Sequence, residues 1–173
     1  MSFIRYIIYL VMLIFAMVLQ STFFDYIQLL DIKPNLMLIT IVSFAYIRGE
    51  KEGGIIGFTG GLLQDCFFGL YVGSNTFIYS VIGYICGNLC KSFYKENFFI
   101  ATGIITVATL VYNFMYYVIN ILLRGYTDIL YFMKNIIVPE MVYNALISLL
   151  VYNLIFIFNE WLEDKESYRR KVF

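Results

Sequence analysis

Two carboxylates inside apolar stretches are the groups in this chain best placed to do chemistry. Asp65 lies well inside one apolar block, beside Gln64, and Glu140 follows Pro139 at the start of the last block. If such a block crosses a bilayer, its carboxylate is costly and faces the bundle interior or a cavity. For Asp65 this leaves three alternatives: a proton or cation site, a hydrogen-bonding anchor for helix packing, or a position near the far interface.

A polar stripe continues from Glu140 at steps of four residues, which places its members on one face of a helix. The members are Glu140, Asn144, Ser148 and Tyr152. A carboxylate in the first helical turn is stabilised by the macrodipole, so Glu140 needs no special role. Asn144 and Ser148 are expected to hydrogen-bond across a helix contact, each for about 0.6 kcal/mol. Alternatively, the stripe lines a polar interior together with Gln20 and Asn113.

The sequence contains no catalytic or metal-binding constellation. There is no histidine, and the three cysteines lie inside apolar segments. Cys86 and Cys90 share a helix at i, i+4, but zinc sites need convergent Cys and His ligands, so the cysteines are interpreted as small apolar fillers. The glycines between Gly53 and Gly61 follow a charged turn and open an apolar block, unlike a phosphate-binding loop. We therefore expect no enzyme, no metal and no cofactor.

Small residues recur along the third apolar block at steps of four, in a ridge that spirals slowly around a helix. The members are Gly53, Gly57, Gly61, Asp65 and Gly69, and the pair Gly83 and Gly87 repeats the step in the fourth block. Small residues let another backbone approach closely, which drives helix association in lipid. Two interpretations remain open: packing between the third and fourth helices, or a docking face for a separate membrane protein.

The composition indicates that these helices lie in a bilayer. Of 173 residues, 61% are hydrophobic and 14% are charged, against roughly 25% charged in soluble domains. We predict an all-α integral membrane protein of about six transmembrane helices, in which residues 1–173 form a single multi-helix transmembrane domain. The expected spans are about 6–24, 36–47, 53–70, 76–90, 98–123 and 136–158, with a mixed segment at 124–134 and a charged cytoplasmic tail at 160–173.

The placement of Lys and Arg predicts the orientation of such a bundle. With about six spans, nine of the 12 Lys and Arg residues fall on one side. That side holds Arg5, Arg48, Lys51, Lys91, Lys95, Lys165, Arg169, Arg170 and Lys171, and the other holds Lys33, Arg124 and Lys134. Both termini are therefore expected to face the cytoplasm. The net charge is zero and there is no basic tract, so no nucleic-acid partner is expected.

Several motifs, taken in order along the chain, resemble those of one protein family. A Lys33-Pro34-Asn35-Leu start precedes a short apolar helix and a charged turn, and Gly-Phe-x-x-Gly-Leu-x-x-Asp follows, ending at Asp65. Gln20 lies in a Leu-Gln-Ser-Thr run, and Pro139 and Asn144 mark the last block. This order and spacing is similar to that of the rod shape-determining protein MreD family. Asn35 stands where the family commonly has Asp.

The resemblance implies a non-catalytic scaffold of the bacterial cell-elongation machinery, in the plasma (inner) membrane. Members of the family associate with MreC, a single-span periplasmic coiled-coil protein. Through MreC they link the actin-like cytoskeletal protein to the peptidoglycan polymerase and transpeptidase of the elongation complex. The lipid bilayer is a further expected partner, and self-association is left open. The resemblance also implies the fold of the substrate-binding subunits of energy-coupling-factor transporters.

That shared fold makes a vitamin-binding transporter subunit the alternative function. Such a subunit is expected to present a substrate pocket toward the outside and to dock through paired alanines on its first helix. The connection at residues 25–35 is short for a pocket lid, and the first apolar block lacks paired alanines. Both observations favour the scaffold.

Overall fold

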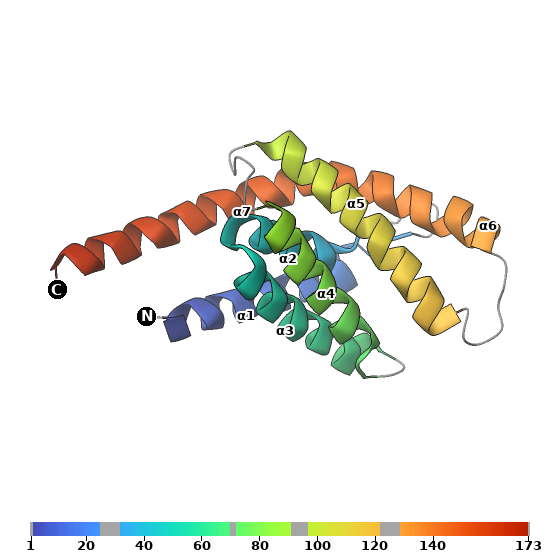
Figure 1. The fold of residues 1–173 in the computed structure, drawn as a ribbon, viewed down its shortest axis with the longest axis horizontal. Coiled ribbons are helices and arrows are strands. Elements are labelled where there is room, and N and C mark those ends of the chain that lie inside the picture. Colours follow the sequence, from blue (N-terminus) through green and yellow to red (C-terminus); the bar gives the residue numbers. More distant parts are fainter. Residues whose placement is uncertain (1, 25–31, 70–71, 91–96, 122–128, 173) are drawn as a thin grey trace.

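The computed structural model is a bundle of helices and describes residues 2–24, 32–69, 72–90, 97–121 and 129–172 (Figure 1). The α-helices are α1 (Ser2–Thr22), α2 (Leu36–Arg48), α3 (Glu50–Phe68), α4 (Ser74–Leu89), α5 (Phe98–Tyr116), α6 (Ile129–Phe132) and α7 (Val138–Val172). The expected all-α fold class is confirmed for these residues.

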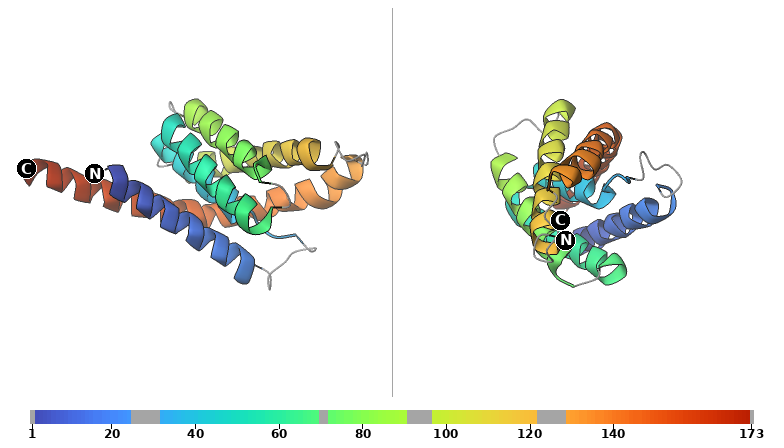
Figure 2. Two further views of the ribbon diagram at one scale, coloured as in Figure 1. Left: turned by 90° about the horizontal axis from the view of Figure 1, so that it is seen from below. Right: turned by 90° about the vertical axis from the view of Figure 1, so that its right-hand side faces the viewer.

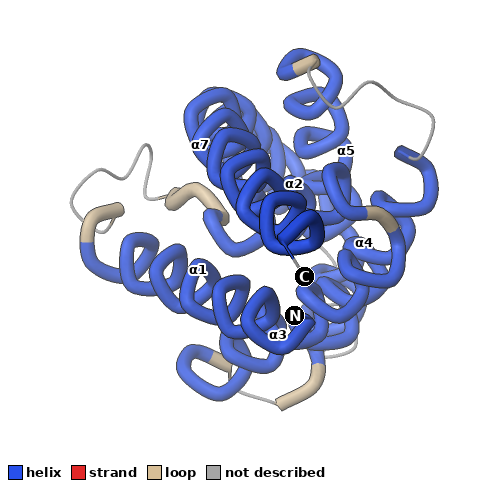
Figure 3. Tube along the Cα trace, turned by 90° about the vertical axis from the view of Figure 1, so that its left-hand side faces the viewer, coloured by secondary structure: helices blue, strands red, loops and turns tan. Residues whose placement is uncertain are grey.

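The short helix α2 forms the centre of the bundle. Every residue from Leu36 to Ile47 is buried, and Figure 3 shows α1, α3, α4, α5 and α7 arranged around it. A helix that is apolar nearly all round is stable only when other elements cover it. Tyr9 and Leu13 of α1 and Ile78 of α4 pack into the same core. The unusual brevity of this apolar block therefore reflects a helix enclosed by protein.

A tight helical hairpin of α3 and α4 packs against α2 (Figure 2). Gly49 joins α2 to α3 with a φ of 94°, a conformation that L side chains rarely adopt, so the chain reverses there within one residue. Gly73 has a φ of 117° and immediately precedes α4. The contact between α3 and α4 is the most extensive helix contact in the described part of the chain.

The last α-helix, α7, begins at Val138, and further helical residues precede it; where the membrane span begins remains a prediction. α6 continues through a π-helical segment, Met133–Ile137, into α7 without a break. Proline has no N–H to donate, and its ring collides with the carbonyl four residues back, which loosens the preceding turn. Residues 129–134 of the expected mixed segment therefore belong to this helix, and residues 124–128 lie outside the described ones. A second π-helical segment, Tyr117–Ile121, extends α5.

The outer surface of the bundle is apolar. Within the described residues, three segments are long and apolar enough to cross a membrane: Arg5–Thr22, Phe98–Asn120 and Ile129–Glu163. Large side chains such as Phe15, Val107 and Leu150 are exposed on α1, α5 and α7, which suits lipid and would promote association in water. Spans over α2, α3 and α4, and hence the total of about six, remain a prediction.

Both ends of the described chain lie at one end of the bundle, where α7 extends past the other helices (Figures 1 and 2). This arrangement requires an even number of crossings if the helices span a membrane. Several charges used for the orientation are not described: Lys91, Lys95 and Arg124 lie outside the described residues, as do the side chains of Lys165, Arg169, Arg170 and Lys171.

Candidate functional site

Asp65 is a buried hydrogen-bond acceptor that joins the end of α3 to the start of α4. Its side chain accepts from the backbone N–H groups of Gly73 at 2.8 Å, Asn75 at 3.1 Å and Thr76 at 2.9 Å. The Thr76 hydroxyl donates to it at 2.6 Å. The first N–H groups of a helix have no partners within the helix, and an anion there is favoured by the helix dipole. These contacts are those of a hydrogen-bonding anchor, and the residue is 1% exposed.

The glycines of α3 and α4 hold two backbones in direct contact. A Cβ added to Gly57 would collide with the carbonyl of Tyr79, and one added to Gly61 would collide with the backbone at Thr76. At Gly53 an added Cβ would lie 2.5 Å from the carbonyl oxygen of Gly83. Gly83 and Gly87 meet the backbones of Gly53 and Gly49 in return. The ridge therefore lies against α4, as the packing interpretation expects, and is not free to dock a partner along these positions.

Gly69 does not belong to this seam, although its spacing placed it on the ridge. It follows the last residue of α3, its backbone N–H donates to the carbonyl of Asp65 at 3.0 Å, and it is exposed. An added Cβ would meet only the backbone of Asp65 among its nearest neighbours. The four-residue spacing of glycines does not reveal where a helix ends. The sequence analysis therefore included Gly69 in the ridge, although α3 ends at Phe68.

A polar network around Asn35 connects the start of α2 by hydrogen bonds to α1, α4 and α7. The Asn35 side chain accepts from the backbone N–H of Leu38 and from the Tyr79 hydroxyl, both at 3.0 Å. Its own backbone N–H donates to the Asn144 side-chain oxygen at 2.8 Å, and Asn144 donates onward to the Thr109 hydroxyl at 3.1 Å. In addition, Gln20 accepts from the Met37 backbone N–H at 3.2 Å. The motif residues Lys33 and Pro34 immediately precede this hub, and Pro34 is buried.

The polar stripe of α7 faces α5. Glu140, Asn144, Ser148 and Tyr152 are each at most 8% exposed. The Asn113 amide donates to the Glu140 carboxylate at 3.0 Å, and the Ser148 hydroxyl donates to that of Thr102 at 3.3 Å. Pro139 lies at the start of this stripe, beyond the π-helical turn. The structure therefore brings Gln20, Asn35, Asn144 and Glu140 into one region at the end of the bundle that holds Asp65.

A charged cluster at the opposite end was missed by the sequence analysis. Arg48 pairs with Glu163 of α7 at 3.0 Å, and Arg5 of α1 pairs with Glu52 of α3 at 3.4 Å. The Tyr9 hydroxyl also donates to Glu52 at 3.0 Å. The i, i+4 spacing of Arg48 and Glu52 was the available signal. These contacts place residues near both termini beside the turn between α2 and α3.

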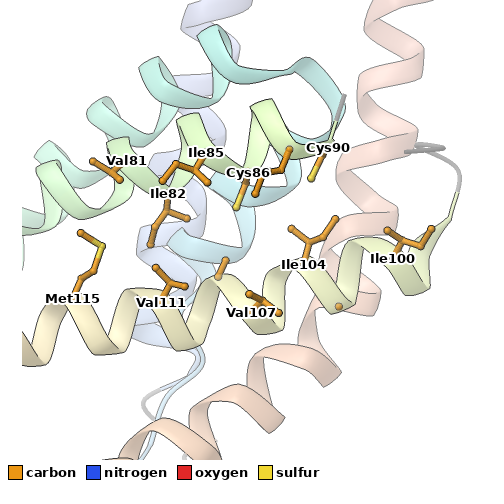
Figure 4. Close-up of a pocket in the computed structure, with 13 residues that line it drawn as sticks. Val81, Ile82, Ile85, Cys86, Cys90, Ile100, Ile104, Val107, Val111 and Met115 are labelled. Carbon is orange, nitrogen blue, oxygen red and sulfur yellow. The ribbon is translucent and has the colours of Figure 1, made fainter. Parts of the chain in front are cut away.

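An apolar groove of about 640 Å³ runs between α4 and α5 (Figure 4). Cys86, Cys90 and Met115 contribute sulfur atoms to its otherwise aliphatic walls. Gly103 also lines the groove, and a Cβ added there would have no neighbour within 4 Å. No three His, Cys, Asp or Glu side chains among the described residues come together to hold a metal ion.

A family model described as rod shape-determining protein MreD matches residues 1–161. No curated protein and no solved structure matches the chain significantly. The resemblance to energy-coupling-factor subunits, and the vitamin-binding alternative that rests on it, therefore have no support.

Proposed function

The chain belongs to the MreD family of rod shape-determining proteins, and we propose from this membership that it is a non-catalytic membrane scaffold for cell elongation. Family membership itself implies a role in determining rod cell shape. The proposed scaffold binds an MreC-like single-span coiled-coil protein. Through that partner it links the actin-like cytoskeletal protein to the peptidoglycan polymerase and transpeptidase.

The packing of the bundle supports a structural role. The backbone contact joins the consecutive helices α3 and α4, and the polar hub at Asn35 joins elements that are far apart in sequence. Small residues and interhelical hydrogen bonds are what hold membrane helices together, because lipid gives apolar side chains no reason to associate. A bundle fixed in this way presents surfaces of constant shape, and the apolar side chains exposed on α1, α5 and α7 are the ones that lipid and membrane partners contact.

We further propose that the protein is a multi-pass protein of the bacterial inner membrane with both termini in the cytoplasm. Arg5 and Arg48 pair with carboxylates at one end of the bundle, and Lys51 belongs to the same turn. Lys33 lies near the polar hub at the other end. The excess of basic residues at the first end agrees with the rule that positive charge stays in the cytoplasm.

The test is purification of the tagged protein from its native membrane in a gentle detergent, followed by mass spectrometry of the proteins that come with it. Recovery of a single-span coiled-coil protein together with wall synthases would support the scaffold. Recovery of a transmembrane coupling subunit with two ATPases would overturn it. A tagged, unrelated multi-pass protein from the same membrane serves as the control for non-specific recovery.

A further inference from the structure

A polar cavity of about 420 Å³ lies at the end of the bundle that holds the Asn35 hub. Cavities of this size hold small molecules or the polar part of larger ones. Three groups of lining residues matter: an acid and amides (Glu140, Asn113 and Gln64), aromatic rings (Tyr112, Tyr116 and Phe132) and one basic residue, Lys33. These come from the ends of α3, α5 and α7 and from the segment before α2, so the cavity forms only in the folded bundle.

The carboxylate of Glu140 is buried, and none of the ion pairs between described residues includes it. Its residue is 8% exposed, and Asn113 donates to it at 3.0 Å. A buried charge requires a partner of opposite sign or neutralisation, because the desolvation penalty is several kcal/mol. A buried carboxylate at a cavity wall is therefore suited to a positively charged ligand.

A second acceptor is unpaired beside the same cavity. The Gln64 side-chain oxygen Oε1 is buried, and no described group donates to it. Buried polar atoms in native proteins nearly always have a hydrogen-bond partner. Glu140 and this oxygen are both hydrogen-bond acceptors, so a ligand that brings N–H donors into the cavity would pair with them.

Aromatic rings complete the wall. Tyr112 stacks on both Tyr79 and Tyr116, with ring centroids 4.9 and 6.0 Å apart, and is 9% exposed, so it offers the cavity little of its face. Tyr116 and Phe132 lie in the same lining. The face of an aromatic ring attracts a cation, and the attraction rises when the cation leaves water. π-helical turns are rare and often mark functional sites. Of those in the described residues, one directly follows Tyr116 and one directly follows Phe132, and both of these rings line the cavity.

We propose that this cavity binds the primary ammonium group of a zwitterionic ligand. Glu140 supplies the counter-charge, Gln64 accepts an N–H hydrogen bond, and Tyr116 and Phe132 pack against the ligand's methylene groups. Lys33, which lines the cavity and is exposed, favours a ligand whose anionic group lies toward the rim. Two sources offer this chemistry: an aminophospholipid headgroup and a free phosphorylated amine.

The experiment uses the full chain reconstituted with equal amounts of phosphatidylethanolamine, phosphatidylcholine and phosphatidylglycerol. Native mass spectrometry then measures which lipid stays bound. O-phosphoethanolamine and phosphocholine are titrated separately by calorimetry as the free counterparts. Phosphatidylcholine and phosphocholine carry a cation without N–H donors, and phosphatidylglycerol carries no cation, so the panel separates charge from hydrogen bonding.

Preferential retention of phosphatidylethanolamine, or calorimetric binding of O-phosphoethanolamine over phosphocholine, is expected. The result tells which source applies: binding of the lipid alone identifies a headgroup, and binding of O-phosphoethanolamine identifies a free ligand. Failure of both to bind, or equal binding of the choline compounds, overturns the proposal.

Matched variants test the assigned residues. Glu140→Gln keeps the shape and an acceptor for Asn113 but removes the charge, and it is expected to weaken binding at least about tenfold. Gln64→Leu removes the second acceptor and is expected to weaken binding less. Glu160→Gln removes an exposed carboxylate from the same helix and is expected to bind like the unmodified chain. Thermal melting of each variant shows that the fold is kept, and undiminished binding by a folded Glu140→Gln variant refutes the role of the charge.

Discussion

At the residue scale, the Asp65 side chain accepts hydrogen bonds from N–H groups at the start of α4 that have no acceptor within that helix. Its carboxylate receives the N–H groups of Gly73, Asn75 and Thr76 together with the Thr76 hydroxyl. In a lipid environment these donors would otherwise be left without water, at a cost of several kcal/mol each when fully buried. The side chain thereby fixes the connection between α3 and α4, and the glycine contacts between those helices depend on that connection.

Asp65→Leu is expected to lower stability by at least about 2 kcal/mol, because several donors lose their only acceptor. Asp65→Asn keeps one acceptor oxygen and is expected to cost about 1 kcal/mol. Thermal melting of the two purified variants in the same detergent compares them. Equal losses in both would show that the negative charge, rather than the acceptor geometry, carries the stabilisation.

Residue types revealed which side chains would be buried but not which would meet. The stripe of Glu140, Asn144 and Ser148 was evident from its spacing because helical periodicity repeats every three to four residues. The contact of Asn35 with Asn144 joins residues from distant parts of the chain, and no local pattern encodes it. The capping of α4 by Asp65 was missed for the same reason, since the acceptor belongs to the preceding helix.

At the scale of elements, α3 and α4 behave as one unit because their backbones touch. Each seam glycine faces a backbone atom rather than a flexible side chain, so the contact cannot adjust to a larger residue by a rotamer change. Overpacking of this kind costs about 1–3 kcal/mol. Gly103 on α5 offers the contrast, since it lines an open groove.

Gly57→Ala is expected to lower the melting temperature and the amount of protein in the membrane, because the new methyl group collides with the Tyr79 carbonyl. Gly103→Ala is the matched control and is expected to be neutral or slightly stabilising, since alanine favours helix by about 1 kcal/mol. Fluorescence-detected size-exclusion chromatography after heating measures both. A Gly57→Ala variant as stable as the Gly103→Ala control would contradict the close-packed seam.

Element boundaries were predictable where composition changes sharply. Leu36 begins α2 because Asn35 caps it, and Phe98 begins α5 because the Asn97 side chain accepts from the N–H groups of the first turn. Pro139 lies in the first turn of α7, and the π-helical segment that precedes α7 leaves no signal in the spacing of apolar residues. Enclosure by neighbouring helices, which explains the short α2, is a tertiary property that hydropathy does not report.

At the scale of the whole molecule, the bundle has two chemically different ends. Ion pairs gather at the end that holds both termini, where Arg48 meets Glu163. Amides, hydroxyls and the buried carboxylate of Glu140 gather at the other end, around Asn35. The proposed orientation places the first end in the cytoplasm and the second outside.

Cysteine labelling in intact spheroplasts tests this orientation at the two ends of the α3–α4 hairpin. In a chain with Cys66, Cys86 and Cys90 replaced by alanine, Ser74→Cys is expected to react with a membrane-impermeant maleimide from outside. Lys51→Cys is expected to react only after permeabilisation. Reaction of both positions from the same side would show that the hairpin does not cross the bilayer.

The length of α7 has a consequence for distance from the membrane. Its 35 residues extend about 50 Å, whereas the hydrocarbon layer is about 30 Å thick. In the proposed orientation the helix would project beyond the bilayer, in a direction set by its packing against α2 and α5. If the proposed span begins near Val138, a fluorophore attached near Val172 would lie on the order of 20 Å beyond the hydrocarbon layer, and a tilt of the bundle would displace that probe sideways.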